Sequence, residues 1–127
     1  MLLTFCRYLA LIYAIGLATG EAVLNSSRGQ WQYAPMWLID YIIVAYLLAG
    51  FWMTRRGRRI AILMSAYALS AGVVYMAFFL HFDPDLPGAL RGDTIVVALI
   101  GLVLVVSVVG LIGTTLAWWQ QERTRRT

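Results

Sequence analysis

The sequence predicts an all-α integral membrane protein with four transmembrane helices and with both its N-terminus and its C-terminus in the cytoplasm. Of its 127 residues 61% are hydrophobic, only 13% are charged, and the mean hydropathy is +0.77. A soluble domain is about half apolar and about a quarter charged. The apolar residues form continuous runs without the alternation of a membrane barrel strand, which favours helices. We therefore expect one membrane domain spanning residues 1–127.

Four apolar segments are long enough to cross a hydrocarbon core, which takes roughly 20 helical residues. We expect these spans at residues 2–24, 36–53, 60–80 and 94–118. Pro35 suits the first turn of the second helix, Asp93 suits the N-cap of the fourth, and turn-forming residues fill 83–88. A cleaved signal peptide is the alternative for the first segment, and it would leave three spans. The apolar run begins ahead of Arg7 and lacks a good cleavage site, so we favour a retained helix.

The direction of the spans follows from the ten basic residues, all of them arginines. Only Arg28 and Arg91 fall on one side of the predicted membrane. The positive-inside rule places the other side in the cytoplasm. We expect a multi-pass protein of a bacterial inner membrane, surrounded by the lipid bilayer and without affinity for nucleic acid. The cytoplasmic side is predicted to carry Arg7, Arg55, Arg56, Arg58, Arg59, Arg123, Arg125 and Arg126.

Small residues in the spans predict where helices touch, because they let backbones approach closely. The third helix has two such stripes, so we expect it to lie centrally between two neighbours. Gly16 and Gly20 could pack within the chain or join two copies of it. The predicted packing residues are Gly16, Gly20, Ala45, Ala49, Ser65, Ala68, Ser70, Gly72, Ser107, Gly110 and Thr114.

Two carboxylates inside apolar runs are the main candidates for function. Asp40 lies near the outer start of the second span, where a carboxylate reaches the headgroups and suits the helix N-terminus. We interpret it as a boundary residue, with a working or buried, paired residue as the alternative. Glu21 lies near the outer end of the first span, where the helix dipole disfavours an anion. We expect it to form an ion pair with Arg28 or Arg91.

His81, Asp83 and Asp85 form the string most similar to a metal site. Zinc takes about four ligands, however, and this chain has one histidine and no nearby cysteine. Asp83-Pro84 is also common turn chemistry. No nucleotide-binding loop, zinc-protease motif or nucleophile elbow is present. We predict no metal, no cofactor and no catalytic residue.

These features favour a non-enzymatic accessory subunit or scaffold of a larger membrane complex, which binds a protein partner or itself through its small-residue faces. One alternative is a small homo-oligomeric transporter with Asp40 or Glu21 as its coupling carboxylate. The absence of an acid near the bilayer midplane argues against it. Another is a membrane enzyme with an outer-face site built from Glu21, Asp40 and His81.

Overall fold

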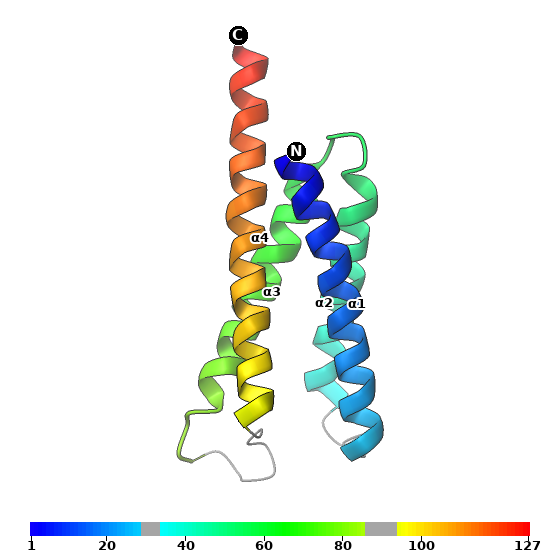
Figure 1. Cartoon of the computed structure of the whole chain (residues 1–127), viewed down its shortest axis with the longest axis vertical. Helices are drawn as coiled ribbons and strands as arrows, with labels where there is room; N and C mark the ends of the chain where they lie inside the picture. The colour runs from blue at the N-terminus through cyan, green and yellow to red at the C-terminus, as the bar shows by residue number, and fades with distance from the viewer. Residues whose placement is uncertain (29–33, 86–93) are drawn as a thin grey trace.

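The protein is an all-α bundle. The computed structural model describes residues 1–28, 34–85 and 94–127, apart from the side chains of residues 24, 25, 27, 28 and 34–36. This part of the chain contains no β-strand and forms the helices α1 (Leu2–Arg28), α2 (Ala34–Met53), α3 (Ile60–Leu80) and α4 (Thr94–Arg126). In Figure 1 successive helices run in opposite directions, and both termini lie at the end that holds the α2–α3 loop. Helix α1 packs mainly on α2 and α4, and α3 packs on the same two helices.

Three helices are long and apolar enough to cross a membrane, at Leu2–Val23, Ile60–Leu80 and Thr94–Arg126. In α2 the apolar stretch over its described side chains, Trp37–Met53, is shorter. Helix α1 continues past the expected residue 24, and α4 continues past residue 118 to Arg126. With its 33 residues α4 is about 50 Å long. The arginine-rich tail is therefore a helical extension of α4.

The turn after α3 begins as its composition predicts. The Asp85 backbone N–H donates to Asp83 Oδ1 at 2.9 Å, a local bond that favours a turn. Residues 86–88 of the expected turn and the expected N-cap, Asp93, lie outside the described residues.

The bundle buries small residues and presents large apolar ones on its outside. Helix α4 contains the most apolar of the three candidate membrane spans, yet its buried residues are Ser107, Gly110, Gly113, Thr114 and Ala117. By contrast, many of its large apolar side chains point outward, with exposed fractions of 74% at Ile95 and 59% at Leu102. A soluble bundle shows the opposite distribution, because water favours polar residues outside.

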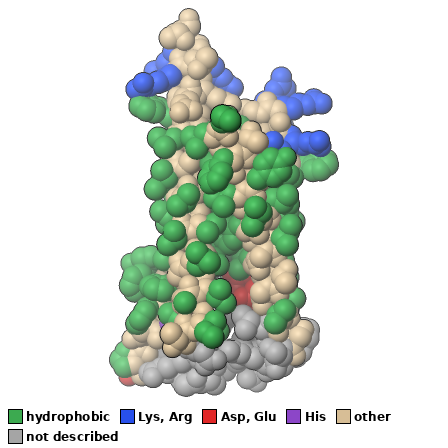
Figure 2. Space-filling model, in the orientation of Figure 1, with side chains coloured by type: hydrophobic (Ala, Val, Ile, Leu, Met, Phe, Trp, Pro, Cys, Tyr) green, Lys and Arg blue, Asp and Glu red, His purple; other side chains and the backbone are tan. Residues whose placement is uncertain are grey.

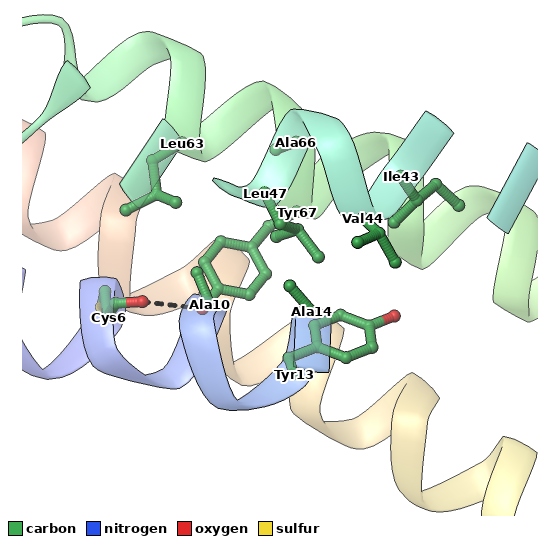
Figure 3. Packing of buried hydrophobic residues seen from close by; sticks show 10 residues of the cluster. All are labelled: Cys6, Ala10, Tyr13, Ala14, Ile43, Val44, Leu47, Leu63, Ala66 and Tyr67. Carbon is green, nitrogen blue, oxygen red and sulfur yellow. Dashed lines mark hydrogen bonds between the residues drawn. The ribbon is translucent and has the colours of Figure 1, made fainter. Parts of the chain in front are cut away.

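Tyr67 on α3 is the largest fully buried side chain and touches two other helices. Its hydroxyl donates to the Cys6 carbonyl of α1 at 2.8 Å, the bond drawn in Figure 3. Its ring lies against Gly110 of α4 so closely that a Cβ there would overlap the ring. Nearby, a Cβ at Gly113 would lie 2.6 Å from Cys6 Sγ. The glycines of α4 therefore let three helices meet at one level.

The predicted packing residues divide into two groups. Ser65 is half-buried and its hydroxyl lies 2.6 Å from that of Tyr46 on α2. Ala49 is also half-buried. The fully buried members of the set are Ser70, Ser107, Gly110 and Thr114.

The other members are exposed, and this corrects the expected arrangement. A Cβ added at Gly16, Gly20 or Gly72 would contact nothing within 4 Å. Helix α3 thus buries one stripe and contacts two helices like each of its neighbours, so it is not more central than they are. Small side chains permit close approach without selecting which face is used. The outward-facing set is Gly16, Gly20, Ala45, Ala68 and Gly72.

The Tyr67–Gly110 contact predicts a position-specific cost. We expect Gly110→Ala to destabilise the bundle by about 1–3 kcal/mol, because the new methyl group overlaps a ring held by a hydrogen bond. Gly72→Ala, the matched control, should cost nothing and can stabilise the helix by up to about 1 kcal/mol. Denaturant unfolding in detergent measures both values. Equal stability of the two variants would contradict the contact.

Candidate functional site

Glu21 of α1 and Asp40 of α2 come together: their carboxyl groups lie within hydrogen-bonding reach of each other and repel when both are charged. Both are half-buried. Glu21 lies seven residues before the end of α1 and Asp40 six residues after the start of α2. At 1.5 Å per residue both lie roughly 10 Å from their helix ends, and hence at similar depth in this antiparallel pair. Figure 2 shows acidic surface recessed between helices just inside this end.

The helix lengths explain why the two carboxyl groups are not at the rim. Helix α1 ends four residues later than expected, at Arg28, and α2 starts two residues earlier, at Ala34. Each extension adds helix on the outer side of a carboxyl group. This geometry favours the alternative interpretation of Asp40, as a buried, paired or working residue, over a boundary carboxylate.

A hydrogen bond between two carboxyl groups requires a proton on one of them. When both are ionised, the two like charges repel each other at short range. The pair therefore titrates as a unit. It can hold a proton between its oxygens, or it can offer those oxygens to a cation once the proton has left. The site is suited to exchanging one positive charge for another.

A cluster of three hydroxyl groups lies deeper in the bundle. Tyr13 of α1, Ser70 of α3 and Ser107 of α4 are buried and hydrogen-bonded to one another. Ser107 Oγ lies 3.0 Å from Ser70 Oγ and 2.9 Å from the Tyr13 hydroxyl. In Figure 3 the Tyr13 hydroxyl points toward the Ile43 end of the core. The charge of Asp40 also acts on this phenol, although the hydrogen bonds of the cluster join only its own three hydroxyl groups and the helix backbone.

His81 has a separate, local role. Its Nδ1 lies 2.6 Å from the Ala77 carbonyl, one turn earlier in α3. Among the side chains that the structure describes, the hydrogen bond of Asp40 joins it to Glu21, and His81 is not part of this pair. Within the same residues no group of three or more His, Cys, Asp or Glu side chains could hold a metal ion. The enzyme hypothesis, which needs all three residues together, gains no support from this arrangement.

The expected cationic partners of Glu21 fall outside the described side chains. The Arg28 side chain and the whole of Arg91 belong to the undescribed part. Asp40 is one partner that the structure gives Glu21, and the expected ion pair with Arg28 or Arg91 stays a prediction.

Tyr13 is the functional candidate that sequence reasoning missed. The sequence has seven tyrosines, and nothing in it distinguishes Tyr13 from the other six. Ser70 and Ser107 were predicted only as small packing residues. The available signal was a general rule: hydroxyl groups within an apolar helix must find partners inside the protein. The sequence does not say which hydroxyl groups meet.

Comparison of the chain with protein-family models, with curated proteins and with solved structures gave no match. A function is therefore inferred from the carboxyl pair and the hydroxyl cluster.

The carboxyl pair makes a prediction that an ion pair would not. Asp40→Asn and Glu21→Gln should each leave the unfolding free energy in detergent unchanged within about 0.5 kcal/mol, or raise it. The amide keeps a hydrogen bond to the remaining carboxylate and removes the repulsion between like charges. Infrared difference spectra should also lose the C=O band of a protonated carboxyl group in either variant.

An ion pair with an arginine would give the opposite result. Neutralising its acid would leave a buried cation unpaired and cost about 3–5 kcal/mol. Such a loss in both variants would show that the pair is not the dominant interaction of Glu21 and Asp40.

Proposed function

We propose that the protein crosses a membrane four times, with its arginine-rich end in the cytoplasm, and acts as a small transporter. In this proposal the Glu21–Asp40 pair takes up a proton and exchanges it for a cationic solute. The observation that carries the proposal is the meeting of two acids from different helices inside an apolar bundle. A solute that competes with a proton for this pair must itself be positively charged.

The distribution of side chains supports membrane insertion and its direction. The outside of the bundle is rich in exposed apolar residues. In Figure 2 the basic side chains gather at the end where the chain termini lie. Trp52, Trp118 and Trp119 are exposed near this end, as in an aromatic belt at a membrane surface. Helix α2 suits a span because 20 residues rise about 30 Å.

The hydroxyl cluster supports a route for the proton. It joins α1, α3 and α4 by hydrogen bonds, and Tyr13 lies within the electrostatic reach of Asp40. A phenol and two hydroxyl groups can each donate and accept a hydrogen bond. A proton leaving the carboxyl pair toward the interior would thus meet groups able to accept it and pass one on.

A second candidate function, an accessory subunit of a larger complex, is favoured by a different observation. Gly16 and Gly20 on α1 and Ala68 and Gly72 on α3 are exposed, and a Cβ added at any of the three glycines would contact nothing within 4 Å. Such faces suit another membrane helix. Purification in mild detergent separates the possibilities. A homo-oligomer fits the transporter, whereas a stoichiometric larger subunit fits the accessory role.

The proposed direction predicts which positions are accessible from outside a cell. A cysteine placed at the exposed Asp85 should react with a membrane-impermeant maleimide in intact cells, and one at Thr127 should not. Cys6 can remain in place because it is fully buried. After permeabilisation both positions should react. Reaction of position 127 alone in intact cells would reverse the proposed orientation.

Proton–cation exchange predicts proton release when a cation binds. In weakly buffered detergent solution, we expect addition of Na⁺, K⁺ or tetraphenylphosphonium to release protons from the protein for at least one of these cations. Asp40→Asn and Glu21→Gln should each reduce the release at least about tenfold, and Tyr13→Phe should slow it without abolishing it.

Asp83→Asn is the matched control, since it neutralises an exposed acid of the same end outside the carboxyl pair. Its proton release should equal that of the unmodified protein. Equal release from the Asp40, Glu21 and Asp83 variants would rule out the pair as the exchange site. Absence of release with all three cations, together with an isolated complex containing a larger subunit, would favour the accessory role.

A further inference from the structure

A groove of about 580 Å³ lies at the arginine-rich end of the bundle. Its walls come from the start of α1, the α2–α3 loop and the extension of α4. The groove is comparable in size with pockets that hold small ligands, about 300–1,000 Å³. Residues that line it include Leu2, Leu3, Arg56, Arg58, Ala117 and Arg125.

Hydrogen bonds hold the basic loop in place. Thr54 is fully buried, and its Oγ1 donates to the Gly50 carbonyl at 2.6 Å. The Gly57 N–H donates to the Thr54 carbonyl at 3.0 Å, and Gln121 Nε2 of α4 donates to the Gly57 carbonyl at 3.1 Å. The loop is thus tied both to α2 and to the extension of α4, which fixes the opposite walls of the groove.

Two residues of this loop have backbone conformations that favour glycine. Gly57 has φ +67°, and Arg59 has φ 58° at the start of α3. For an arginine this conformation costs about 1–2 kcal/mol relative to a right-handed one. The loop that contains this strained residue has six residues, and four of them are arginines.

The lining combines two chemistries. Arg56, Arg58 and Arg125 supply guanidinium groups, which bind phosphate oxygens in a planar, bidentate manner. Leu2 and Leu3 supply apolar surface beside them. The loop and the α4 extension together contain seven arginines and one acid, Glu122, which gives a formal charge of +6. A ligand that satisfies both parts carries a phosphate and an apolar chain.

We propose that this groove binds the headgroup of an anionic phospholipid, with the phosphate at the arginines and the start of the acyl chains along the apolar wall. The site rests on the membrane insertion of the proposed function, and it does not depend on the carboxyl pair at the other end of the bundle. It selects phosphatidylglycerol-like lipids over zwitterionic ones, because a zwitterionic headgroup brings its own cation to the arginines.

Quenching of tryptophan fluorescence by brominated lipids in phosphatidylcholine vesicles tests the site. The protein, with Trp31→Phe and Trp37→Phe, keeps only Trp52, Trp118 and Trp119 as reporters at the arginine-rich end. It is reconstituted in phosphatidylcholine vesicles that contain an equal minor fraction of either brominated phosphatidylglycerol or brominated phosphatidylcholine. We expect stronger quenching by brominated phosphatidylglycerol. Equal quenching by the two lipids would overturn the site but leave membrane insertion standing.

A matched pair of triple variants separates a built site from general attraction. R56Q/R58Q/R125Q removes three arginines that line the groove, and R55Q/R59Q/R123Q removes the same charge from positions that do not line it. Both variants lose the same diffuse attraction to the anionic surface, so the difference between them reports contacts made in the groove. The first should lose at least about tenfold more of its preference for brominated phosphatidylglycerol than the second. The preference is measured as the ratio of quenching by the two lipids within each variant, since Arg55 and Arg123 themselves contact Trp52 and Trp119. Equal loss in both would mean diffuse attraction and would overturn the groove.

Two further outcomes complete the test. Excess inorganic phosphate should not displace the brominated phosphatidylglycerol, because phosphate lacks the apolar part of the ligand. Displacement would identify a free phosphate site instead of a lipid site. Absence of quenching by either brominated lipid would overturn membrane insertion and, with it, this proposal.

Discussion

The contact of Tyr67 with Gly110 is the constraint on which the rest of the bundle depends. It fixes α3 against α4, and the hydroxyl of the same side chain fixes both to the Cys6 carbonyl of α1. Ser70 and Ser107 each lie three residues from this contact on their own helices, about 4.5 Å further along the bundle. Their meeting with Tyr13 therefore follows from the same helix approach. A Cβ at position 110 would overlap the Tyr67 ring, so either the ring or the helix would have to shift and the spacing of the hydroxyl groups would change.

In a bundle whose outside is apolar, polar groups must be satisfied inside. Thr54 and Thr114 meet this requirement locally, by donating to the carbonyls four residues earlier, those of Gly50 and Gly110. Tyr13, Ser70 and Ser107 meet it between helices. The carboxyl pair is different, because its hydrogen bond exists only while a proton is present. Loss of that proton would place two like charges side by side in the bundle.

Hydropathy was sufficient to predict the helices, because a run of about 20 apolar residues has few other structures available to it. The three apolar helices and the end of α2 at Met53 follow this rule. The ends of α1 and α4 did not follow it, since polar residues such as Arg28 and Arg126 can continue a helix into water. Small residues predicted close approach but not its direction, so Ser107 is buried and Gly72 is exposed. Glu21 and Asp40 were identified singly, and nothing in the sequence pairs one with the other. Two acids from different helices meet only when the bundle forms.

The two ends of the molecule carry opposite chemistry, and their separation gives the fold a direction. Seven arginines lie in the α2–α3 loop and the extension of α4, where Arg55 and Arg123 stack on Trp52 and Trp119 at 5.0 and 3.7 Å from the ring centres. The carboxyl pair lies toward the opposite end, inside the bundle. Arginine stays charged under all physiological conditions, so the charge of the basic end is permanent. A carboxyl pair gains and loses charge with its proton. In the proposed function, the permanent charge orients the protein in the membrane, and the variable charge responds to a solute that arrives from the other side.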